Sequence, residues 1–290
     1  MEQQQIEAFL SVVQTGSFSA AAQSLYVAQP TLSRRIESLE AELGCQLFDR
    51  GRGRRCATLT QTGLAMVDVA HRWMSLWTET QSLVKTGGRP VMRISAYQTL
   101  SLSIMPHAIC RIVGLGLPLK LDLFTTLSKD AYPLVEKGEL DLAFVAQSRH
   151  SELAQSVPLY TEPLTIACSK DSPYFDGMSP RELDGSKAVR LEASQEHAIW
   201  HNYWFGDDTY ALRADGLAFA TQLLHQGGYW VVAPLTLARW LERTENLRCL
   251  RCDNMPPDRT THYITREPSN PTHQAIAAQV KSVADELMGA

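Results

Sequence analysis

The sequence has no long apolar run and no recognisable export signal. None of its apolar stretches approaches the ~20 residues that a membrane-spanning helix needs. The opening residues, MEQQQIEAF, contain neither the basic nor the apolar segment of an export signal. We therefore expect a cytoplasmic protein without a membrane partner.

The common signatures of enzymes are also missing. The chain contains no nucleophile elbow, no Walker loop, no Gly-x-Gly-x-x-Gly motif and no paired metal ligands. These absences argue against an enzyme, and nothing in the sequence predicts a cofactor or a metal.

Cysteine is infrequent and follows no framework. The six positions are Cys45, Cys56, Cys110, Cys168, Cys249 and Cys252. The last two form a single Cys-x-x-Cys, but a zinc site would need a second pair or nearby histidines. A thioredoxin-type motif would have to open a helix after a strand. We expect reduced, incidental thiols.

The overall charge is weakly acidic but unevenly distributed. The 290 residues carry a net charge of −4, and 44% of them are hydrophobic, as in an ordinary globular protein of about two domains. Residues 1–90 contain 9 basic and 8 acidic side chains, whereas residues 91–290 contain 18 and 23. The run RGRGRR at 50–55 is a local basic patch, and such a patch, rather than net charge, decides contact with nucleic acid.

Three short helices open the chain. Ile6, Phe9 and Val13 predict the first, ending near Gly16. Ser17 or Ser19 then caps a short alanine-rich helix, which allows close approach of its neighbour. A turn at YVAQ leads into the third helix, QPTLSRRIESLEAELG. This order, with helices joined by about four residues, predicts a helix-turn-helix at about 18–37.

The third helix has one apolar face and one unusual polar face. Leu32, Ile36, Leu39 and Leu43 form the apolar stripe. The opposite face carries an amide, hydroxyls and guanidiniums in place of the Glu and Lys pairs of an ordinary solvated surface. Such groups read bases and phosphates.

The next segments predict a wing and a long helix. QLF and CATLT read as two short strands with the arginine run between them. Thr60 or Thr62 then caps a helix over 61–88, in which Trp73, Met74 and Trp77 are too large and apolar for a small winged domain. We expect a dimerising arm; a buried helix of the next domain is the alternative.

Residues 3 to 65 together resemble the LysR-type transcriptional regulators. The resemblance implies an α+β winged helix-turn-helix at 1–60 that binds double-stranded DNA at a pseudo-palindromic operator. It implies that the DNA is met by Gln29, Pro30, Thr31, Ser33 and Arg34 on the third helix and by Arg50, Arg52, Arg54 and Arg55 in the wing. One departure is Ala28, where the family usually has a capping serine; its absence costs about 1 kcal/mol of helix stability.

Residues 91–290 alternate strand and helix signals, which predicts parallel α/β sheets. The resemblance implies an effector domain with two Rossmann-like lobes, similar to periplasmic solute-binding proteins. The first lobe would take 91–163 and 262–290, and the second 164–261. The ligand cleft would lie between them, where helix N-termini favour anions.

Polar residues that follow the predicted strands are the candidate effector contacts. By position they are Tyr97, Gln98, Thr99, Leu100, Ser101, Ser128, Gln147, Ala193, Ser194 and Gln195. Tyr229 and Trp230 would add rings across the cleft, favouring a flat ligand. No Lys or Arg falls in the cleft by this reasoning, so we expect a singly charged effector rather than a dicarboxylate.

The segment HAIWHNYWF at 197–205 contains two histidines and four aromatic rings. A metal site or an aromatic-ligand site is one interpretation. Core packing of one helix face is the interpretation that we favour.

These observations predict a DNA-binding transcriptional regulator and not an enzyme. Its partners would be operator DNA, a small organic effector that is anionic or aromatic, and further copies of the chain as a homodimer or a dimer of dimers, with RNA polymerase a further partner. A thiol-based redox sensor using Cys168, Cys249 or Cys252 is the main alternative, and a solute-binding or enzymatic two-lobed protein is the other. The sequence does not identify the effector, the operator or the sign of regulation.

Overall fold

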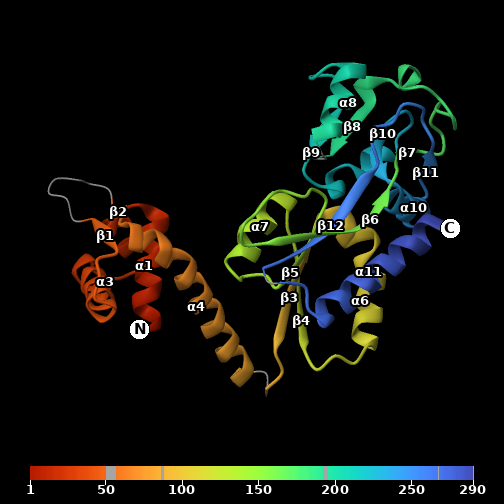
Figure 1. Cartoon of the computed structure of the whole chain (residues 1–290). Helices are drawn as coiled ribbons and strands as arrows, with labels where there is room; N and C mark the ends of the chain where they lie inside the picture. The colour runs from red at the N-terminus through yellow and green to blue at the C-terminus, as the bar shows by residue number, and fades with distance from the viewer. Residues whose placement is uncertain (50–56, 86–87, 192–194, 267, 290) are drawn as a thin grey trace. The chain divides into compact units, whose positions relative to one another are not determined.

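The computed structural model describes residues 1–49, 57–85, 88–191, 195–266 and 268–289. The chain divides into two compact units, 1–91 with 137–139, and 92–136 with 140–290 (Figure 1). Within the described residues, no helix combines the length and apolarity of a membrane span.

The first unit begins with three helices, α1 (Gln3–Thr15), α2 (Phe18–Ser24) and α3 (Gln29–Leu43). Gly16 ends α1 in the left-handed conformation, at φ 66°. The Ser17 hydroxyl accepts the Ala20 N–H at 3.4 Å and so caps α2. The helices close on Ile6, Phe9 and Leu32, which have no solvent exposure. The predicted periodicity is therefore confirmed in the core.

A two-stranded antiparallel ribbon follows, formed by β1 (Phe48–Asp49) and β2 (Thr58–Leu59). The buried Glu40 carboxylate accepts the N–H groups of Leu47 and Phe48 at 2.8 and 3.2 Å, which ties the first strand to α3. The four wing arginines, Arg50, Arg52, Arg54 and Arg55, lie outside the described residues.

The long helix α4 (Gln61–Lys85) is capped by Thr60, which accepts the Gly63 N–H at 2.9 Å and donates to the Gln46 carbonyl at 2.8 Å. Gly63 is required here because a Cβ at this position would lie 2.1 Å from the Leu47 carbonyl oxygen. The start of α4 therefore packs directly on the ribbon.

The second unit contains two five-stranded sheets, which define its two lobes. The first sheet has the order β4-β3-β5-β12-β6 and the second β11-β7-β10-β8-β9. The strands of the first are β3 (Val91–Ala96), β4 (Lys120–Thr125), β5 (Leu142–Val145), β6 (Gln155–Glu162) and β12 (Arg259–Thr265). Those of the second are β7 (Leu164–Cys168), β8 (Ala188–Leu191), β9 (Leu212–Ala214), β10 (Trp230–Pro234) and β11 (Arg248–Leu250).

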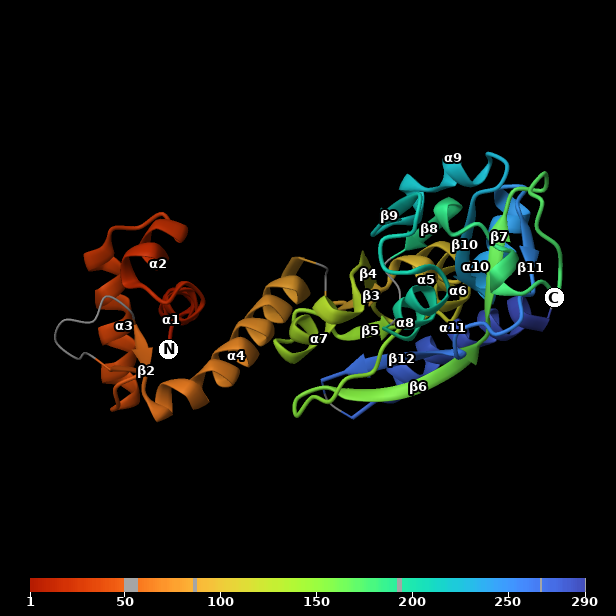
Figure 2. The same cartoon turned by 90° about the horizontal axis from the view of Figure 1, so that it is seen from above.

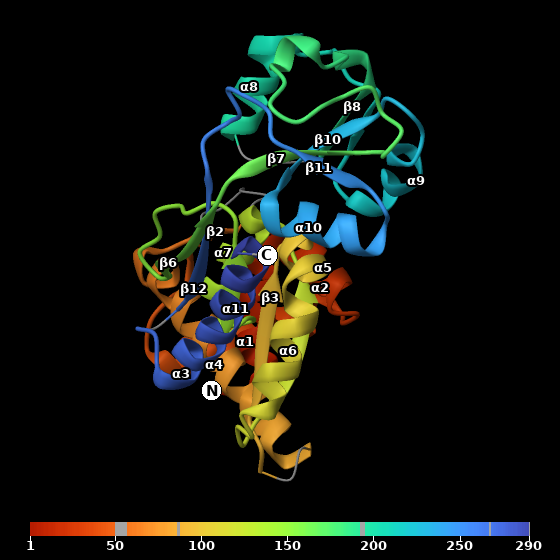
Figure 3. The ribbon, with the colours of Figure 1, turned by 90° about the vertical axis from the view of Figure 1, so that its right-hand side faces the viewer.

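Helices cover both sheets (Figures 2 and 3). With the first sheet go α5 (Gln98–Ser103), α6 (Met105–Gly114), α7 (Ser128–Glu136) and α11 (Pro271–Gly289). With the second go α8 (Gln195–Phe205), α9 (Thr221–Leu224), α10 (Leu235–Thr244) and three short 3₁₀ turns at Pro180–Glu182, Gly185–Lys187 and Leu217–Phe219. The first lobe buries Ile94, Phe144 and Ile276. The second lobe has an apolar cluster on each face of its sheet.

The sheets are mixed, which corrects the prediction of parallel sheets. Strand β3 is parallel to β5, and β8 is parallel to β9 and β10. Strand β12, however, is antiparallel to β5 and β6, and β7 is antiparallel to β10 and β11. These strands arrive from the other lobe rather than through a helix on the same sheet, so the right-handed crossover that makes neighbours parallel does not apply.

The chain crosses between the lobes twice (Figures 1 and 3). Only Pro163 separates β6 from β7. The second crossing lies between β11 and β12. Strand β12 begins at Arg259, three residues before position 262, where the sequence predicted that the first lobe begins again. This difference places Arg259 in the first sheet.

Candidate DNA-reading surface and effector pocket

The outer face of α3 is open to solvent. Gln29, Pro30, Thr31 and Arg34 are exposed, and Ser33 is half-buried. No hydrogen bond or ion pair joins Arg34 to another residue that the structure describes. Arg35, by contrast, donates to the Gln4 side chain at 2.8 Å. The face therefore presents an amide, hydroxyls and one uncommitted guanidinium, which suits contact with bases and phosphates.

The first turn of α3 has no side-chain cap, because Ala28 occupies the N-cap position. Pro30 in this turn removes one N–H that would otherwise need a partner. The Thr31 and Leu32 N–H groups both donate to the Ala28 carbonyl, at 2.9 and 3.1 Å, so the Gln29 N–H is the one at this end that has no bond to another described residue and could meet a DNA phosphate.

Helix α4 exposes large apolar side chains along its length. Leu64 and Leu76 are each 62% exposed, and Val84 is 80% exposed. The Trp73 ring packs against the core of the first unit and stacks on the Trp77 ring, with the centroids 5.6 Å apart and the planes 6° apart. An apolar edge of this kind is typical of a helix that pairs with another.

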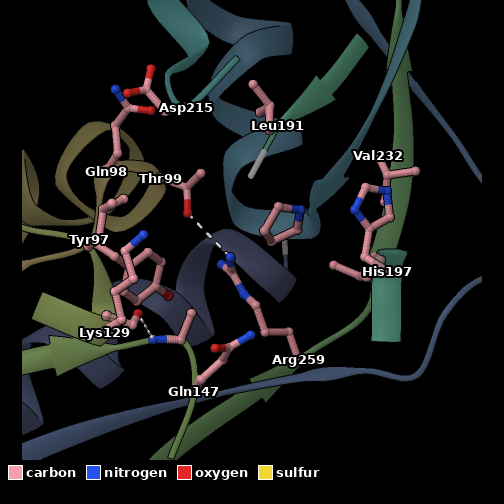
Figure 4. A pocket seen from close by; sticks show the side chains of 15 residues that line it. Tyr97, Gln98, Thr99, Lys129, Gln147, Leu191, His197, Asp215, Val232 and Arg259 are labelled. Atoms are coloured by element: carbon pink, nitrogen blue, oxygen red, sulfur yellow. Dashed lines mark hydrogen bonds between the residues drawn. The ribbon is translucent and has the colours of Figure 1, made fainter. Parts of the chain in front are cut away.

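A pocket of about 170 Å³ lies between the two lobes of the second unit (Figure 4). The first lobe contributes Tyr97, Gln98, Thr99, Leu127, Ser128, Lys129, Ala146, Gln147 and Arg259. The second lobe contributes Leu164, Leu191, His197, Asp215, Val232 and Pro234. In the figure Tyr97, Thr99, Lys129 and Gln147 lie opposite Leu191, Val232 and His197.

Arg259 is the functional residue that the sequence analysis missed, and it corrects the expectation of a cleft without Lys or Arg. Its guanidinium donates to Glu162 Oε1 at 2.8 Å and to Thr99 Oγ1 at 3.3 Å, and its Cζ lies 4.9 Å from the Tyr97 ring centroid. Lys129 also lines the pocket. Arg259 stands at the start of the segment RTTHYITR, but nothing in that segment shows that its strand returns to the first lobe beside β6.

Glu162 is fully buried behind Arg259. Besides the arginine, its carboxylate accepts the Thr236 N–H at 3.0 Å and the Thr236 hydroxyl at 2.7 Å, at the start of α10. Burial alone would lower the pKa of Arg259, but the neighbouring Tyr97 and Glu162 raise it above its usual value, so the guanidinium stays charged. Glu162 on β6 and Arg259 on β12 therefore connect Thr99 of the first lobe with Thr236 of the second lobe.

Two buried phenols lie near Arg259, and one of them, that of Tyr97, lines the pocket. The Tyr97 hydroxyl lies 2.6 Å from Thr261 Oγ1. Burial raises the pKa of Tyr97 and raises that of Tyr160 well above its usual value, so both remain neutral. Burial likewise lowers the pKa of His197 to about 4, with the charge on Arg190 and the neighbouring His201 acting in the same direction. His197 is therefore a neutral wall of the pocket near neutral pH.

A direct hydrogen bond joins the lobes at the pocket. Gln98 Oε1, from α5, accepts the Leu217 N–H at 3.0 Å. A Cβ on Gly216 would lie 2.8 Å from the Gln98 amide nitrogen, so glycine leaves room for this contact. Across the pocket the Ser128 hydroxyl oxygen accepts the Ala146 N–H at 2.9 Å, which leaves its own O–H free to donate.

The structure brings five of the predicted effector residues to the pocket: Tyr97, Gln98, Thr99, Ser128 and Gln147. Leu100 is 1% exposed and packs in the core of the first lobe, while Ser101 lies at a second, apolar pocket beside β4. Ala193 and Ser194 lie outside the described residues, and only the backbone of Gln195 is described, at the start of α8.

Trp230 is not at the pocket, which corrects the expectation of a ring across the cleft. Its side chain is 1% exposed, and its indole N–H donates to the Asp184 carbonyl at 2.8 Å inside the second lobe. Tyr229 is likewise not among the described lining residues; its ring lies 4.4 Å from Lys187 Nζ.

The histidine-rich segment packs as a helix face. His197, Trp200 and His201 are 4%, 7% and 1% exposed, whereas Ile199 and Tyr203 point to solvent. In the described part of the chain, no three His, Cys, Asp or Glu side chains gather as metal ligands.

Comparison with known families matches both units. Residues 3–64 match the bacterial regulatory helix-turn-helix of the lysR family, and residues 85–285 match the LysR substrate binding domain. The chain belongs to the LysR family. It is a DNA-binding transcriptional regulator of the LysR type.

Several relatives of this LysR-type regulator align with nearly its whole length, and others align with part of it. A hydrogen peroxide-inducible genes activator from Pectobacterium carotovorum is 25% identical over 98% of this chain and 96% of its own. A probable nitrogen assimilation transcriptional activator from Synechocystis is 33% identical over 60% and 57%. Full-length OxyR from Pseudomonas aeruginosa, a cysteine-to-aspartate variant, has the same fold, with a TM-score of 0.62 at 20% identity over 98% of this chain and 94% of that one.

Two cysteines of this LysR-type regulator, Cys249 and Cys252, are weakly acidic. Cys168 and Cys249 lie on neighbouring strands, but their side chains belong to the apolar clusters on opposite faces of the sheet. Burial raises the pKa of Cys249, and Glu242 adds to the effect; burial also raises the pKa of Cys252 to about 11. A thiolate is the reactive form, so these thiols are poor nucleophiles.

Proposed function

We propose that this LysR-type regulator acts by binding rather than by catalysis, and that a small-molecule effector in the pocket between the lobes controls its action on DNA. The observation that carries the proposal is the pocket itself, because both lobes line it, with Leu164 and Arg259 each next to one of the two crossings between the lobes. A ligand there contacts both lobes at once, so it stabilises one arrangement of the lobes over others.

We further propose that α3 reads the operator, with Gln29, Thr31, Ser33 and Arg34 at base edges and phosphates and the wing arginines on the flanking backbone. The exposure of this face and the uncommitted Arg34 support the assignment. Helix α4 would pair two such heads through its exposed apolar edge, giving a dimer that matches a pseudo-palindromic site.

Redox control by thiols is the competing function, since a peroxide-responsive activator is among the relatives. The raised pKa values of Cys249 and Cys252, and the position of Cys168 and Cys249 in the apolar clusters on opposite faces of the sheet, favour a small-molecule effector instead. We expect operator affinity to be the same with hydrogen peroxide and with a reductant. A peroxide-dependent change that Cys168→Ser or Cys249→Ser abolishes would support the competing function.

A thermal-shift screen of metabolites on the full-length chain tests the effector proposal. Leu191→Trp fills the pocket, and Val113→Trp, at an exposed position of α6, is the matched control. We expect stabilising metabolites that lose their effect on Leu191→Trp only. Ligands that stabilise both variants equally would place the effector outside this pocket.

A further inference from the structure

The two lobes give the pocket walls of opposite character. The first lobe contributes mainly polar side chains, those of Gln98, Thr99, Ser128, Lys129, Gln147 and Arg259, beside Tyr97, Leu127 and Ala146. From the second lobe the wall is largely aliphatic: Leu164, Leu191, Val232 and Pro234. A ligand that satisfies both walls must have a polar end and an apolar body.

The charges are divided in the same way. Arg259 and Lys129 are on the side of the first lobe, and Asp215 is the acid that the second lobe brings to the described lining. His197, also from the second lobe, is neutral near neutral pH. An anionic group therefore belongs against the first lobe, and a second anionic group on the ligand would meet Asp215 and aliphatic side chains.

Arg259 has hydrogen-bonding capacity to spare. A guanidinium has five N–H groups, and hydrogen bonds to other described residues engage two of them, toward Glu162 and Thr99. The bond to Thr99 is long, at 3.3 Å. Nε has no partner among the described residues but is buried, so the N–H groups left for a ligand are those of Nη1 and Nη2. The planar fork of an arginine binds a carboxylate in two parallel hydrogen bonds.

We propose that the effector is a small monocarboxylate with an apolar body, bound with its carboxylate on Arg259 and Thr99 and its body against the second lobe. The inference rests on the proposed function, because it concerns the ligand of that same pocket. The pocket volume of about 170 Å³ is similar to the ~150 Å³ of an engineered cavity that holds benzene, so it has room for a small acid.

Glu162 competes with the ligand for Arg259. Its carboxylate already holds Nη2 at 2.8 Å, and it keeps two hydrogen bonds from Thr236 when the arginine turns toward a ligand. Glu162 therefore weakens carboxylate binding. Replacing it with glutamine, which keeps an acceptor for Thr236 but has no charge, releases the arginine and tightens binding of an acid.

Calorimetry on the full-length chain with two matched series tests the proposal: hexanoate, hexanamide and adipate, and benzoate, benzamide and terephthalate. We expect each monocarboxylate to bind on the order of tenfold tighter than its amide, as one charged hydrogen-bonding group contributes, and tighter than its dicarboxylate. The Arg259→Gln/Glu162→Gln double variant keeps the buried site neutral and should bring the acid-to-amide ratio near one. Glu162→Gln alone should raise that ratio several-fold, and Arg111→Gln, at an exposed ion pair on α6, should leave it unchanged.

The proposal is overturned if acid and amide bind equally, if the dicarboxylates bind tighter, or if neither monocarboxylate binds. It is also overturned if the acid-to-amide ratio of the double variant equals that of the wild type. The screen above separates this failure from that of the proposed function. If the screen finds only amines or neutral metabolites, and Leu191→Trp abolishes their binding, then the effector is not a monocarboxylate but the pocket is still the effector site. If the ligands bind Leu191→Trp as well as they bind the wild type, then the pocket is not the effector site.

Discussion

At the scale of single residues, two neighbouring arginines on α3 differ in their surroundings and so in their expected roles. Arg34 has no partner among the described residues, whereas Arg35 donates to Gln4. We expect Arg34→Ala to weaken operator binding by about 1–3 kcal/mol and to narrow the difference between operator and random DNA. Gel-shift affinities on both DNAs measure this.

Arg35→Ala is the matched control for that variant. It removes the same charge from the same helix, so the purely electrostatic part of binding should fall to a similar extent. The ratio of operator to random-DNA affinity should, however, stay close to that of the wild type. An Arg34→Ala variant that keeps the wild-type ratio would show that this arginine does not read bases.

The buried histidines of α8 make stability depend on pH. Burial lowers the pKa of His197 and of His201 to about 4, from about 6.5 in an unfolded chain. The unfolded state therefore binds more protons between these values. The free energy of unfolding is therefore not reduced by these histidines above about pH 6.5, and it decreases as the pH falls toward 4.

We expect His201→Phe to reduce this loss. Phenylalanine fits among the Phe205 and Trp230 rings, whose centroids lie 5.1 and 6.5 Å from that of His201, and it cannot be protonated. The difference in melting temperature between pH 7.5 and pH 5 should be smaller for this variant than for the wild type. An equal difference would mean that His201 does not contribute to the acid sensitivity.

At the scale of elements, α4 is the helix that we propose to hold the dimer. Trp77→Glu places a charge on the apolar edge and should convert dimers to monomers, with loss of affinity for a two-fold operator. Thr78→Glu adds the same charge at an exposed position and should leave the dimer intact. Sedimentation measures the oligomeric state of both variants. A Trp77→Glu protein that is still a dimer would contradict the proposed role of α4.

Elements whose signals are local were predicted well from the sequence. The apolar stripe of Leu32, Ile36 and Leu39 defines α3 because helical periodicity involves only neighbours in the chain. Thr99 and Ser128 reach the pocket because side chains that follow parallel strands gather at one sheet edge. Neither inference required knowledge of the other lobe.

Features that depend on distant parts of the chain were not predictable in this way. Arg259 reaches the pocket because β12 returns from the second lobe beside β6, which no local pattern reveals. Strand β10 is buried on both faces, so its sequence has no alternation to show which way Trp230 points. The antiparallel strands escaped prediction because their direction is set by the two crossings between lobes.

At the scale of the whole molecule, the account requires that ligand binding and DNA binding be separable but coupled. Thr99→Val and Ser128→Ala each remove one hydroxyl from the pocket and should lower effector affinity several-fold, since a neutral hydrogen bond contributes about 0.5–1.5 kcal/mol. Operator affinity without effector should not change. The transcriptional response should disappear only in the double variant, as a reporter assay and calorimetry with the screened ligand would show.

The most direct test of the central claim measures operator affinity and operator bending with and without the screened effector, in the wild type and in Leu191→Trp. In the wild type, we expect the effector to change operator affinity, operator bending or both. The operator should in turn change effector affinity by the same factor by which the effector changes operator affinity. Leu191→Trp should bind the operator as the wild type does without effector and should not respond to it. A full response to the effector in Leu191→Trp would contradict the claim that the pocket between the lobes controls this regulator.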